Sequence, residues 1–331
     1  MIHPIPPGTR DVLPDEMREL RRLQRALLEV FEARGYGEVA TPAIEYDEVL
    51  ARGDGRTAAS AYRFFDEGEL LALRSDMTVP IARLAASRLA GGEQPLRLCY
   101  LASAYRAVRP QRGQMREFIQ AGVELIGVPA PQGTAEVVEV LEAALDAAGL
   151  DRAVIGLGDA DLYRQLLTEY GVEGEARDSI IARLATHDLV GLEAELSAVE
   201  GISDEQCATC VALSQLRGGS EVLERARGLG GAAVERATAR LQATFEELER
   251  RGVAERVQID LGLLRDLGYY SGAILEVYDP ALGHVLGGGG RYDGLLKRFG
   301  ADLPAAGFAL YLERVHVAQM EEESRRGGEG R

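Results

Sequence analysis

Two polar side chains on one short stretch of this chain have the types and the spacing to bind a small ligand. The odd-numbered positions from 119 to 125 are apolar, whereas Gln120 and Glu124 alternate with them. A period of two is typical of a β-strand that presents one face to a core. Gln120 and Glu124 would then lie on its other face, on either side of Gly122, whose missing side chain leaves a gap. An amide and a carboxylate beside a gap suit a ligand with N–H donors. A half-solvated strand without a ligand is the alternative interpretation.

Arginines come directly before this stretch. Residues 106–116 contain four arginines around Pro110 and Gly113, which predict a turn between two strands. Guanidinium groups suit an anionic group such as a phosphate or a carboxylate. Arg112 and Arg116 could equally be solvated turn residues.

The bulk composition favours a cytoplasmic globular protein. The 331 residues, 46% of them hydrophobic, suffice for one large or two modest domains. A net charge of −16 argues against a general surface for nucleic acid or anionic membranes. No run of about 18 apolar residues predicts a membrane span, and the N-terminus has no apolar signal core.

Neither the cysteines nor the histidines predict a metal site or a disulfide framework. Cys207 and Cys210 form a C-x-x-C pair, which could bind metal or carry redox chemistry. No second Cys or His pair stands near it, so two buried helix cysteines are the favoured interpretation. The histidines are scattered and suggest no metal cluster or catalytic dyad: His3, His187, His284 and His316.

Periodicity predicts an α+β fold with a mixed, mainly antiparallel sheet flanked by helices. We expect helices over 15–34, 79–90 and 133–149, strands over 36–40, 96–101, 153–157, 257–261 and 269–278, and a hairpin from 62–65 and 70–73. Residues 1–172 and 251–320 would form this core. Residues 173–250, rich in Ala, Leu, Glu and Arg, would form an all-helical insertion, and 321–331 a disordered tail.

The second half of the predicted core contains two tyrosines and a run of glycines. Residues 269–278 alternate, so Tyr269 and Tyr270 should lie on opposite faces of a strand, with Tyr269 in the core. The four glycines of 287–290 allow strand backbone to pass close to a neighbour or a ligand. Arg291 and Asp293 could pair structurally at the start of a helix over 294–299.

Six motifs spread over nearly the whole chain carry a family resemblance. They are Pro7-Gly8-Thr9-Arg10-Asp11 with Leu13-Pro14; Leu73-Arg74-Ser75-Asp76-Met77-Thr78; Tyr105-Arg106 with Gln120 and Glu124; Arg265-Asp266-Leu267-Gly268-Tyr269-Tyr270; Gly289-Gly290-Arg291-Tyr292-Asp293; and Gly307-Phe308-Ala309 with Glu313-Arg314. Together they resemble the catalytic core of histidyl-tRNA synthetase, which has the class II aminoacyl-tRNA synthetase fold.

The resemblance implies a histidine pocket. Its residues would be Asp76, Thr78, Arg106, Gln120, Glu124, Arg265, Tyr269 and Tyr270. In the family, the residues at Asp76 and Thr78 hold the α-amino group of histidine, helped by the one at Gln120. Those at Glu124 and Tyr270 read the imidazole, and a carboxylate is what an imidazole N–H requires.

The resemblance also implies a nucleotide site that is altered here. Arg106 and Arg265 match the arginines that face the ligand carboxylate and, in the synthetase, the reacting α-phosphate. The synthetase has an adenine-reading Glu at the position of Val108 and a phosphate-binding basic residue at Gln114. It has a Gly at Tyr311, whose ring would fill the adenosine space. Losing one buried charged hydrogen bond costs about 1.5–3 kcal/mol, so ATP binding should be strongly weakened.

A chain that combines a histidine pocket with an altered ATP site resembles the regulatory subunits of ATP phosphoribosyltransferase. The chain stops soon after Arg314, where the synthetase continues into an anticodon-binding domain. The resemblance implies a non-catalytic subunit that uses no cofactor and binds no tRNA. It would form a homodimer and bind the short-form catalytic subunit of ATP phosphoribosyltransferase, which acts in histidine biosynthesis. L-histidine would be a candidate ligand. The alternatives are a histidine-activating ligase that lacks the anticodon-binding domain and a tRNA-binding or scaffold module with a vestigial pocket.

Overall fold

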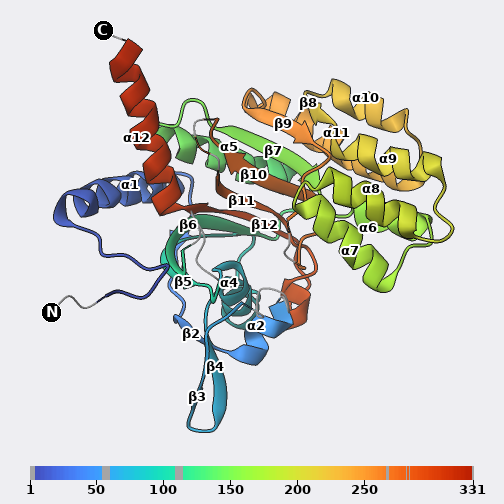
Figure 1. The fold of residues 1–331 in the computed structure, drawn as a ribbon. Coiled ribbons are helices and arrows are strands. Elements are labelled where there is room, and N and C mark those ends of the chain that lie inside the picture. Colours follow the sequence, from blue (N-terminus) through green and yellow to red (C-terminus); the bar gives the residue numbers. More distant parts are fainter. Residues whose placement is uncertain are drawn as a thin grey trace.

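A nine-stranded mixed sheet runs through the centre of the molecule (Figure 1). The computed structural model describes residues 4–53, 60–108, 115–265, 268–280, 282 and 284–329, with 327–329 as backbone only. In spatial order the strands are β1 (Gly37–Glu38), β5 (Leu96–Tyr105), β6 (Glu117–Ile126), β12 (Ala305–Tyr311), β11 (Val285–Arg291), β10 (Ala273–Tyr278), β7 (Val154–Asp159), β9 (Val257–Asp260) and β8 (Arg217–Gly218). Among the strand pairs that the described residues form, only β1–β5 and β7–β9 are parallel, so the mainly antiparallel sheet is confirmed.

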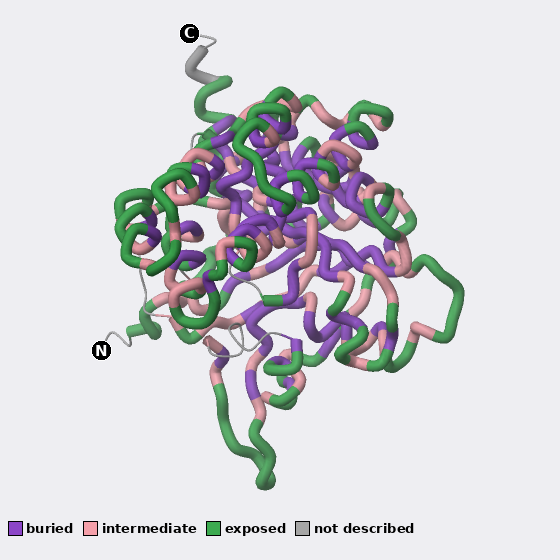
Figure 2. Tube along the Cα trace, turned by 90° about the vertical axis from the view of Figure 1, so that its right-hand side faces the viewer, coloured by how far each residue is buried: buried purple, intermediate pink, exposed green. Residues whose placement is uncertain are grey.

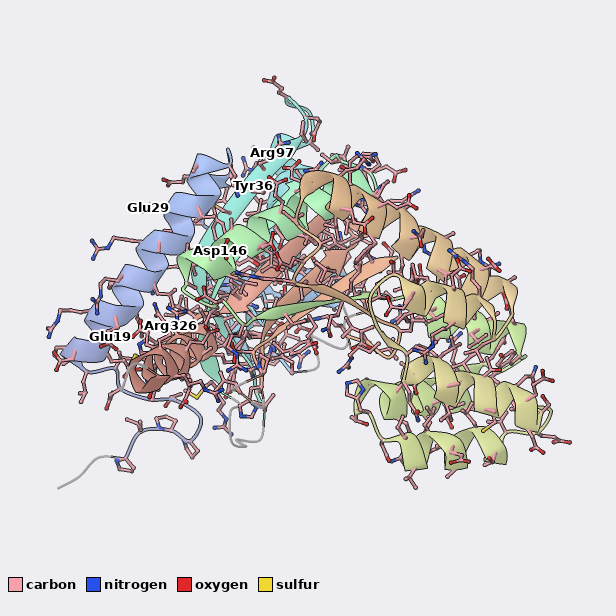
Figure 3. The ribbon with its side chains drawn as sticks, turned by 90° about the horizontal axis from the view of Figure 1, so that it is seen from above. Glu19, Glu29, Tyr36, Arg97, Asp146 and Arg326 are labelled. Atoms are coloured by element: carbon pink, nitrogen blue, oxygen red, sulfur yellow. The ribbon has the colours of Figure 1, made fainter. Side chains whose placement is uncertain are left out.

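Helices cover one face of the sheet. Figure 3 shows α1 (Pro14–Ala33), α5 (Gln132–Ala147) and α11 (Ala232–Arg251) side by side over it, with α12 (Leu312–Glu329) beside α1. Helix α1 begins at a proline, which fits the first helical turn because its missing N–H has no partner there. The apolar positions of α1 recur at a spacing of three or four and are buried: Leu20, Leu23, Leu27 and Phe31.

The opposite face carries the shorter elements. Helix α4 (Thr78–Leu84) continues as a π-helical turn, η1 (Ala85–Leu89), near α2 (Asp47–Gly53) and the 3-10 helix η2 (Leu296–Phe299). Met77, Val79 and Ile81 pack here in a second core cluster.

A small second sheet has the order β2 (Ile44–Tyr46), β4 (Glu69–Leu73) and β3 (Arg63–Asp66). The hairpin of β3 and β4 projects from the body (Figure 1), and much of it is exposed (Figure 2). This hairpin confirms the prediction made from the two runs on either side of Asp66-Glu67-Gly68.

Residues 173–250 consist of helices joined by short turns, together with the two residues of β8. Its helices are α7 (Gly174–Ala185), α8 (Leu189–Ala198), α9 (Asp204–Ser214), α10 (Glu221–Arg227) and α11, and α6 (Leu162–Glu169) precedes them. Helix α9 starts with a capping box, in which Ser203 and Gln206 satisfy each other's backbone N–H groups. Strand β8 pairs with β9, so the segment is attached to the edge of the main sheet.

The expected disordered tail from residue 321 is wrong, because α12 continues to Glu329. The buried carboxylate of Glu322 accepts hydrogen bonds from the backbone N–H groups of Asp151 and Arg152, each 3.1 Å long. Arg326, labelled in Figure 3, donates to the carbonyl of Gly149 at 2.7 Å. These contacts give a strongly charged segment a partner that its composition did not reveal.

Candidate functional site

Strand β6 places Glu124 inside the second core. The alternation predicted for this strand is confirmed, since Ala121, Val123 and Leu125 pack in the core under α1 and α5. The other face is not half-solvated, however, because Gln120 and Glu124 are 3% and 1% exposed. The carboxylate of Glu124 accepts hydrogen bonds from the hydroxyl groups of Thr78, at 2.8 Å, and Tyr292.

Burial has a strong effect on this carboxyl group. Desolvation raises the pKa of Glu124 from 4.5 to about 8, although the two hydroxyl donors partly oppose the shift. Gly307 lies opposite Glu124 on β12, and a Cβ there would stand 1.9 Å from the carboxylate. The carboxyl group therefore occupies space that only a glycine leaves.

The gap expected over Gly122 is filled. Tyr100 on β5 faces Gly122, and a Cβ at Gly122 would lie 2.6 Å from the Tyr100 hydroxyl and 2.1 Å from the carbonyl of Phe308. The prediction of ligand room at this position is therefore wrong, because the neighbouring strand supplies a ring that the local alternation could not reveal.

Asp76 and Thr78 lie at the start of α4. Asp76 Oδ1 accepts a hydrogen bond from the backbone N–H of Val79 at 3.1 Å, as an N-terminal capping residue does. The same turn points the Thr78 hydroxyl at Glu124. Both expected amino-group ligands are thus brought to the Glu124 side of the sheet.

Gln120 contributes a buried polar atom for which the described part of the chain supplies no partner. Its residue stands opposite Tyr311 on β12 and Ala102 on β5. Among the described residues, nothing donates a hydrogen bond to Gln120 Oε1. An unsatisfied buried acceptor is costly, and a ligand with an N–H donor would satisfy it.

Two of the predicted arginines act electrostatically on the same tyrosine, Tyr311. Arg106 donates to the carbonyl of Ser75 at 3.2 Å and lies 3.5 Å from the Tyr311 hydroxyl. Arg265 reaches the carbonyls of Leu275 and Gly287 at 3.3 and 3.4 Å. Burial opposes ionisation of Tyr311, but the guanidinium groups of Arg106, Arg265 and Arg314 outweigh it and lower the Tyr311 pKa to about 8.

The glycine run on β11 makes room for one of these arginines. A Cβ at Gly288 would stand only 1.6 Å from Arg265 Nη1. The prediction that these glycines allow a close neighbour is thus confirmed at Gly288, and the neighbour is a predicted site residue.

Tyr269 and Tyr270 are both in the site, although they do not belong to a strand. Strand β10 begins only at Ala273, so the prediction that Tyr269 and Tyr270 lie on opposite faces of a strand is wrong. The two rings pack against each other with centroids 4.9 Å apart, and Tyr269 also meets the edge of Tyr292 at 5.9 Å. Burial raises the pKa of Tyr270 to about 12, with Arg265 opposing and Glu124 adding to the shift.

A cavity of about 430 Å³ adjoins these residues. Its described lining includes Arg106, Val108 and Tyr311, but not Asp76, Glu124 or the tyrosine pair. The remaining lining residues are Arg10, Glu16, Met115, Phe118, Leu282, His284, Glu313, Arg314 and Val317. The Tyr311 ring forms one wall of this cavity, where it stacks on Arg314 at 4.6 Å and meets the edge of Phe118 at 5.5 Å. That this ring takes up space which a glycine leaves for adenosine in the synthetase stays a prediction.

Tyr292 and Tyr100 line the site but were not among the residues predicted for it. Tyr292 is the clearer case. It lies 168 positions from Glu124 along the chain, yet its hydroxyl donates to that carboxylate. The only available signal was its place in the Gly289–Asp293 motif. Tyr100 was missed in the same way, because its ring crosses from a neighbouring strand.

The other sequence candidates are structural or lie outside the described residues. Arg291 pairs with Asp293 and is 2% exposed, so the structural interpretation is confirmed. Arg116 donates to the carbonyl of Val108 at 3.1 Å. Cys207 and Cys210 belong to α9, and no group of three potential metal ligands occurs in the described part of the chain. The expectations for Arg112 and Gln114 fall on residues that the structure does not describe.

Comparisons with known proteins identify the family of this chain. A family model described as histidyl-tRNA synthetase matches residues 8–315. A protein of Symbiobacterium thermophilum is 43% identical over 322 residues, 96% of this chain and 80% of the relative. One from Moorella thermoacetica is 42% identical over 320 residues, with 96% and 82% covered. Both are named ATP phosphoribosyltransferase regulatory subunit.

The chain belongs to the ATP phosphoribosyltransferase regulatory subunit family, within the histidyl-tRNA synthetase family.

Solved structures from this family have the same fold. A Bacillus halodurans protein, described as an ATP phosphoribosyltransferase regulatory subunit/histidyl-tRNA synthetase, has a TM-score of 0.85 and 34% identity, with 96% of this chain and 84% of that chain covered. A histidine–tRNA ligase subunit from Alicyclobacillus acidocaldarius has a TM-score of 0.84 and 30% identity, with 98% and 99% covered. The class II synthetase-like fold expected from the motifs is confirmed.

The eight residues predicted for the site converge in space. All eight predicted site residues lie at the Glu124 side of the main sheet, on β6, at the start of α4, after β5 and between β9 and β10. Within the described residues, none of the helices combines the length and the apolar character needed to span a bilayer.

Proposed function

We propose that this chain is the regulatory subunit of ATP phosphoribosyltransferase and that its buried polar site binds L-histidine. The observation that carries the ligand proposal is the acceptor pair on β6. Gln120 Oε1 is buried without a partner among the described residues, and the Glu124 carboxyl group is buried at 1% exposure. Histidine supplies an amino group and an imidazole N–H, and these are the donors that such acceptors require.

The arginine side of the site fits the other end of an amino acid. Burial and repulsion from the nearby Arg265 guanidinium lower the pKa of Arg106, although Tyr311 and Asp76 outweigh them and raise it overall. A ligand carboxylate between the two arginines would reduce this repulsion and form charge-assisted hydrogen bonds. Asp76 and Thr78 would hold the α-amino group, and Tyr269 and Tyr270 would enclose the imidazole ring.

The proposal includes a partner and a non-catalytic role. The partner is the short-form catalytic subunit, and this chain would activate it as a homodimer without cofactor or tRNA. Self-association is supported by exposed apolar side chains on the small sheet, where Ile44, Tyr46 and Phe65 are 47%, 51% and 78% exposed. The lack of catalysis is supported by the Tyr311 hydroxyl, which lies 3.5 Å from Arg106, the arginine that the resemblance to the synthetase assigns to the reacting phosphate.

Calorimetric titration of L-histidine and, separately, ATP into the full chain tests the ligand proposal. We expect histidine to bind, Glu124→Gln to abolish the binding and Glu117→Gln, an exposed change on the same strand, to leave it intact. Absence of histidine binding to the wild type, both alone and with the catalytic subunit, would refute a histidine site.

A second assay separates the regulatory subunit from a histidine-activating ligase. The ligase is favoured by one observation, the 430 Å³ cavity beside Arg106. We expect no histidine-dependent ATP–pyrophosphate exchange from the chain alone, and activation of the short-form catalytic subunit when the two are mixed. Clear exchange by the purified chain would instead establish the ligase.

A further inference from the structure

A bidentate ion pair ties the outer helix α11 to the end of a central strand. Arg240 Nε and Nη2 donate to Asp159 Oδ2 and Oδ1, each over 2.8 Å. The Asp159 side chain is fully buried, whereas that of Arg240 is 38% exposed. A buried carboxylate depends on such a partner, because leaving it uncompensated in the interior is costly.

The same carboxylate starts a short chain of hydrogen bonds towards the tyrosine pair. Asp159 Oδ1 also accepts from the backbone N–H of Asp161 at 3.0 Å. Asp161 Oδ2 then accepts from the backbone N–H of Gly272 at 3.2 Å, and the carbonyl of Gly272 accepts from the N–H of Ala160 at 2.7 Å. Both backbone groups of Gly272 are therefore held by the turn that follows β7.

Gly272 fixes the direction in which the chain leaves the site. Its φ of +70° lies in the left-handed region, which glycine adopts without strain. Tyr270 lies two residues earlier, and Ser271 between them donates its N–H to the carbonyl of Arg291 at 2.8 Å. The segment is thus attached on one side to β11 and on the other to the Asp159 turn.

Resting on the proposed histidine site, we infer that Arg240 is a positioning residue for that site: its pair with Asp159 fixes the turn that anchors Gly272 and so sets the place of Tyr269 and Tyr270. A half-exposed side chain on α11 thereby controls the ligand affinity of a buried pocket that it does not touch.

The chain offers a matched control one helical turn away. Arg236, also on α11, donates to the side chains of Gln165 and Glu169 of α6 over 2.9 Å each, so its bonds end on α6 and not on the carboxylates of Asp159 and Asp161. The experiment compares Arg240→Gln with Arg236→Gln in the full chain. Hydrogen–deuterium exchange of the unliganded protein is followed in the peptide 268–275, with 285–291 of β11 as the internal reference.

We expect Arg240→Gln to raise exchange in 268–275 by about tenfold relative to the reference peptide and to weaken L-histidine binding by about tenfold. Arg236→Gln should change neither by more than about twofold. Asp159→Asn should reproduce the effect, and combining it with Arg240→Gln should add little, since both remove one interaction. Arg240→Lys should keep part of the L-histidine affinity that Arg240→Gln loses. If Arg240→Gln fails to fold, Arg240→Lys takes its place in the comparison.

Equal local exchange in Arg240→Gln and Arg236→Gln overturns the inference, and so does histidine binding that is unchanged by Arg240→Gln. A uniform rise in exchange across both peptides also overturns it, because that indicates a global loss of stability. The exchange measurement needs no ligand, so it decides the positioning role even if the wild type fails to bind histidine and the proposed function is wrong.

Discussion

Replacing Glu124 with glutamine should change how the stability of this protein depends on pH. The carboxyl group is 1% exposed and receives hydrogen bonds from Thr78 and Tyr292. Desolvation nevertheless raises its pKa from 4.5 to about 8. Between these two values the folded protein therefore holds a proton that the unfolded chain has released.

The sign and size of the effect follow from proton linkage. A carboxyl group with a raised pKa stabilises the folded state fully below 4.5, and this contribution is lost as the pH rises through 8. The loss approaches about 1.4 kcal/mol per pH unit within that range. Between pH 5.5 and 7.5, the free energy of unfolding of the wild type should therefore fall by up to about 2.7 kcal/mol more than that of Glu124→Gln.

Urea denaturation at several pH values between 5.5 and 7.5 measures this difference. Other partly buried carboxyl groups with raised pKa values, such as Glu276 and Glu313, are present in both proteins and cancel in the comparison. Glu117→Gln, an exposed change on the same strand, should follow the wild type. Parallel wild-type and Glu124→Gln profiles, with a constant offset across the range, would show that Glu124 is ionised in the folded protein and refute the reasoning.

Two further predictions concern β12. Gly307→Ala would place a Cβ 1.9 Å from the Glu124 carboxylate and 2.4 Å from the carbonyl of Val123, so it should destabilise the fold by about 1–3 kcal/mol in urea denaturation. Gly294→Ala, with open space around it, should have little effect. Equal stability of the two variants would contradict this packing. Tyr311 should ionise near pH 8, because the guanidinium groups of Arg106, Arg265 and Arg314 outweigh its burial. Absorbance titration should therefore detect a tyrosinate with a pKa of about 8 in the wild type that is missing in Tyr311→Phe. Identical titration curves would show that the arginines do not act on this ring.

The sequence by itself determined the local structure around the site and its residue set. Alternation from 119 to 125 predicted β6 and the side of it on which Glu124 lies, because side chains in a strand point alternately to its two faces. The spacing of apolar residues predicted α1, since a helix brings every third or fourth residue to one side. The motifs indicated the eight site residues, which the fold brings to one side of the sheet.

Tertiary structure alone decided what fills the site and what holds it. Tyr100 crosses Gly122 from the adjacent strand, and Tyr292 reaches Glu124 from 168 positions away. Glu322 anchors a charged tail that composition marked as disordered. Periodicity reports only which face a residue occupies along its own strand or helix. The partner across that face depends on strand register and on packing between distant segments, and so does the burial that raises the pKa of Glu124.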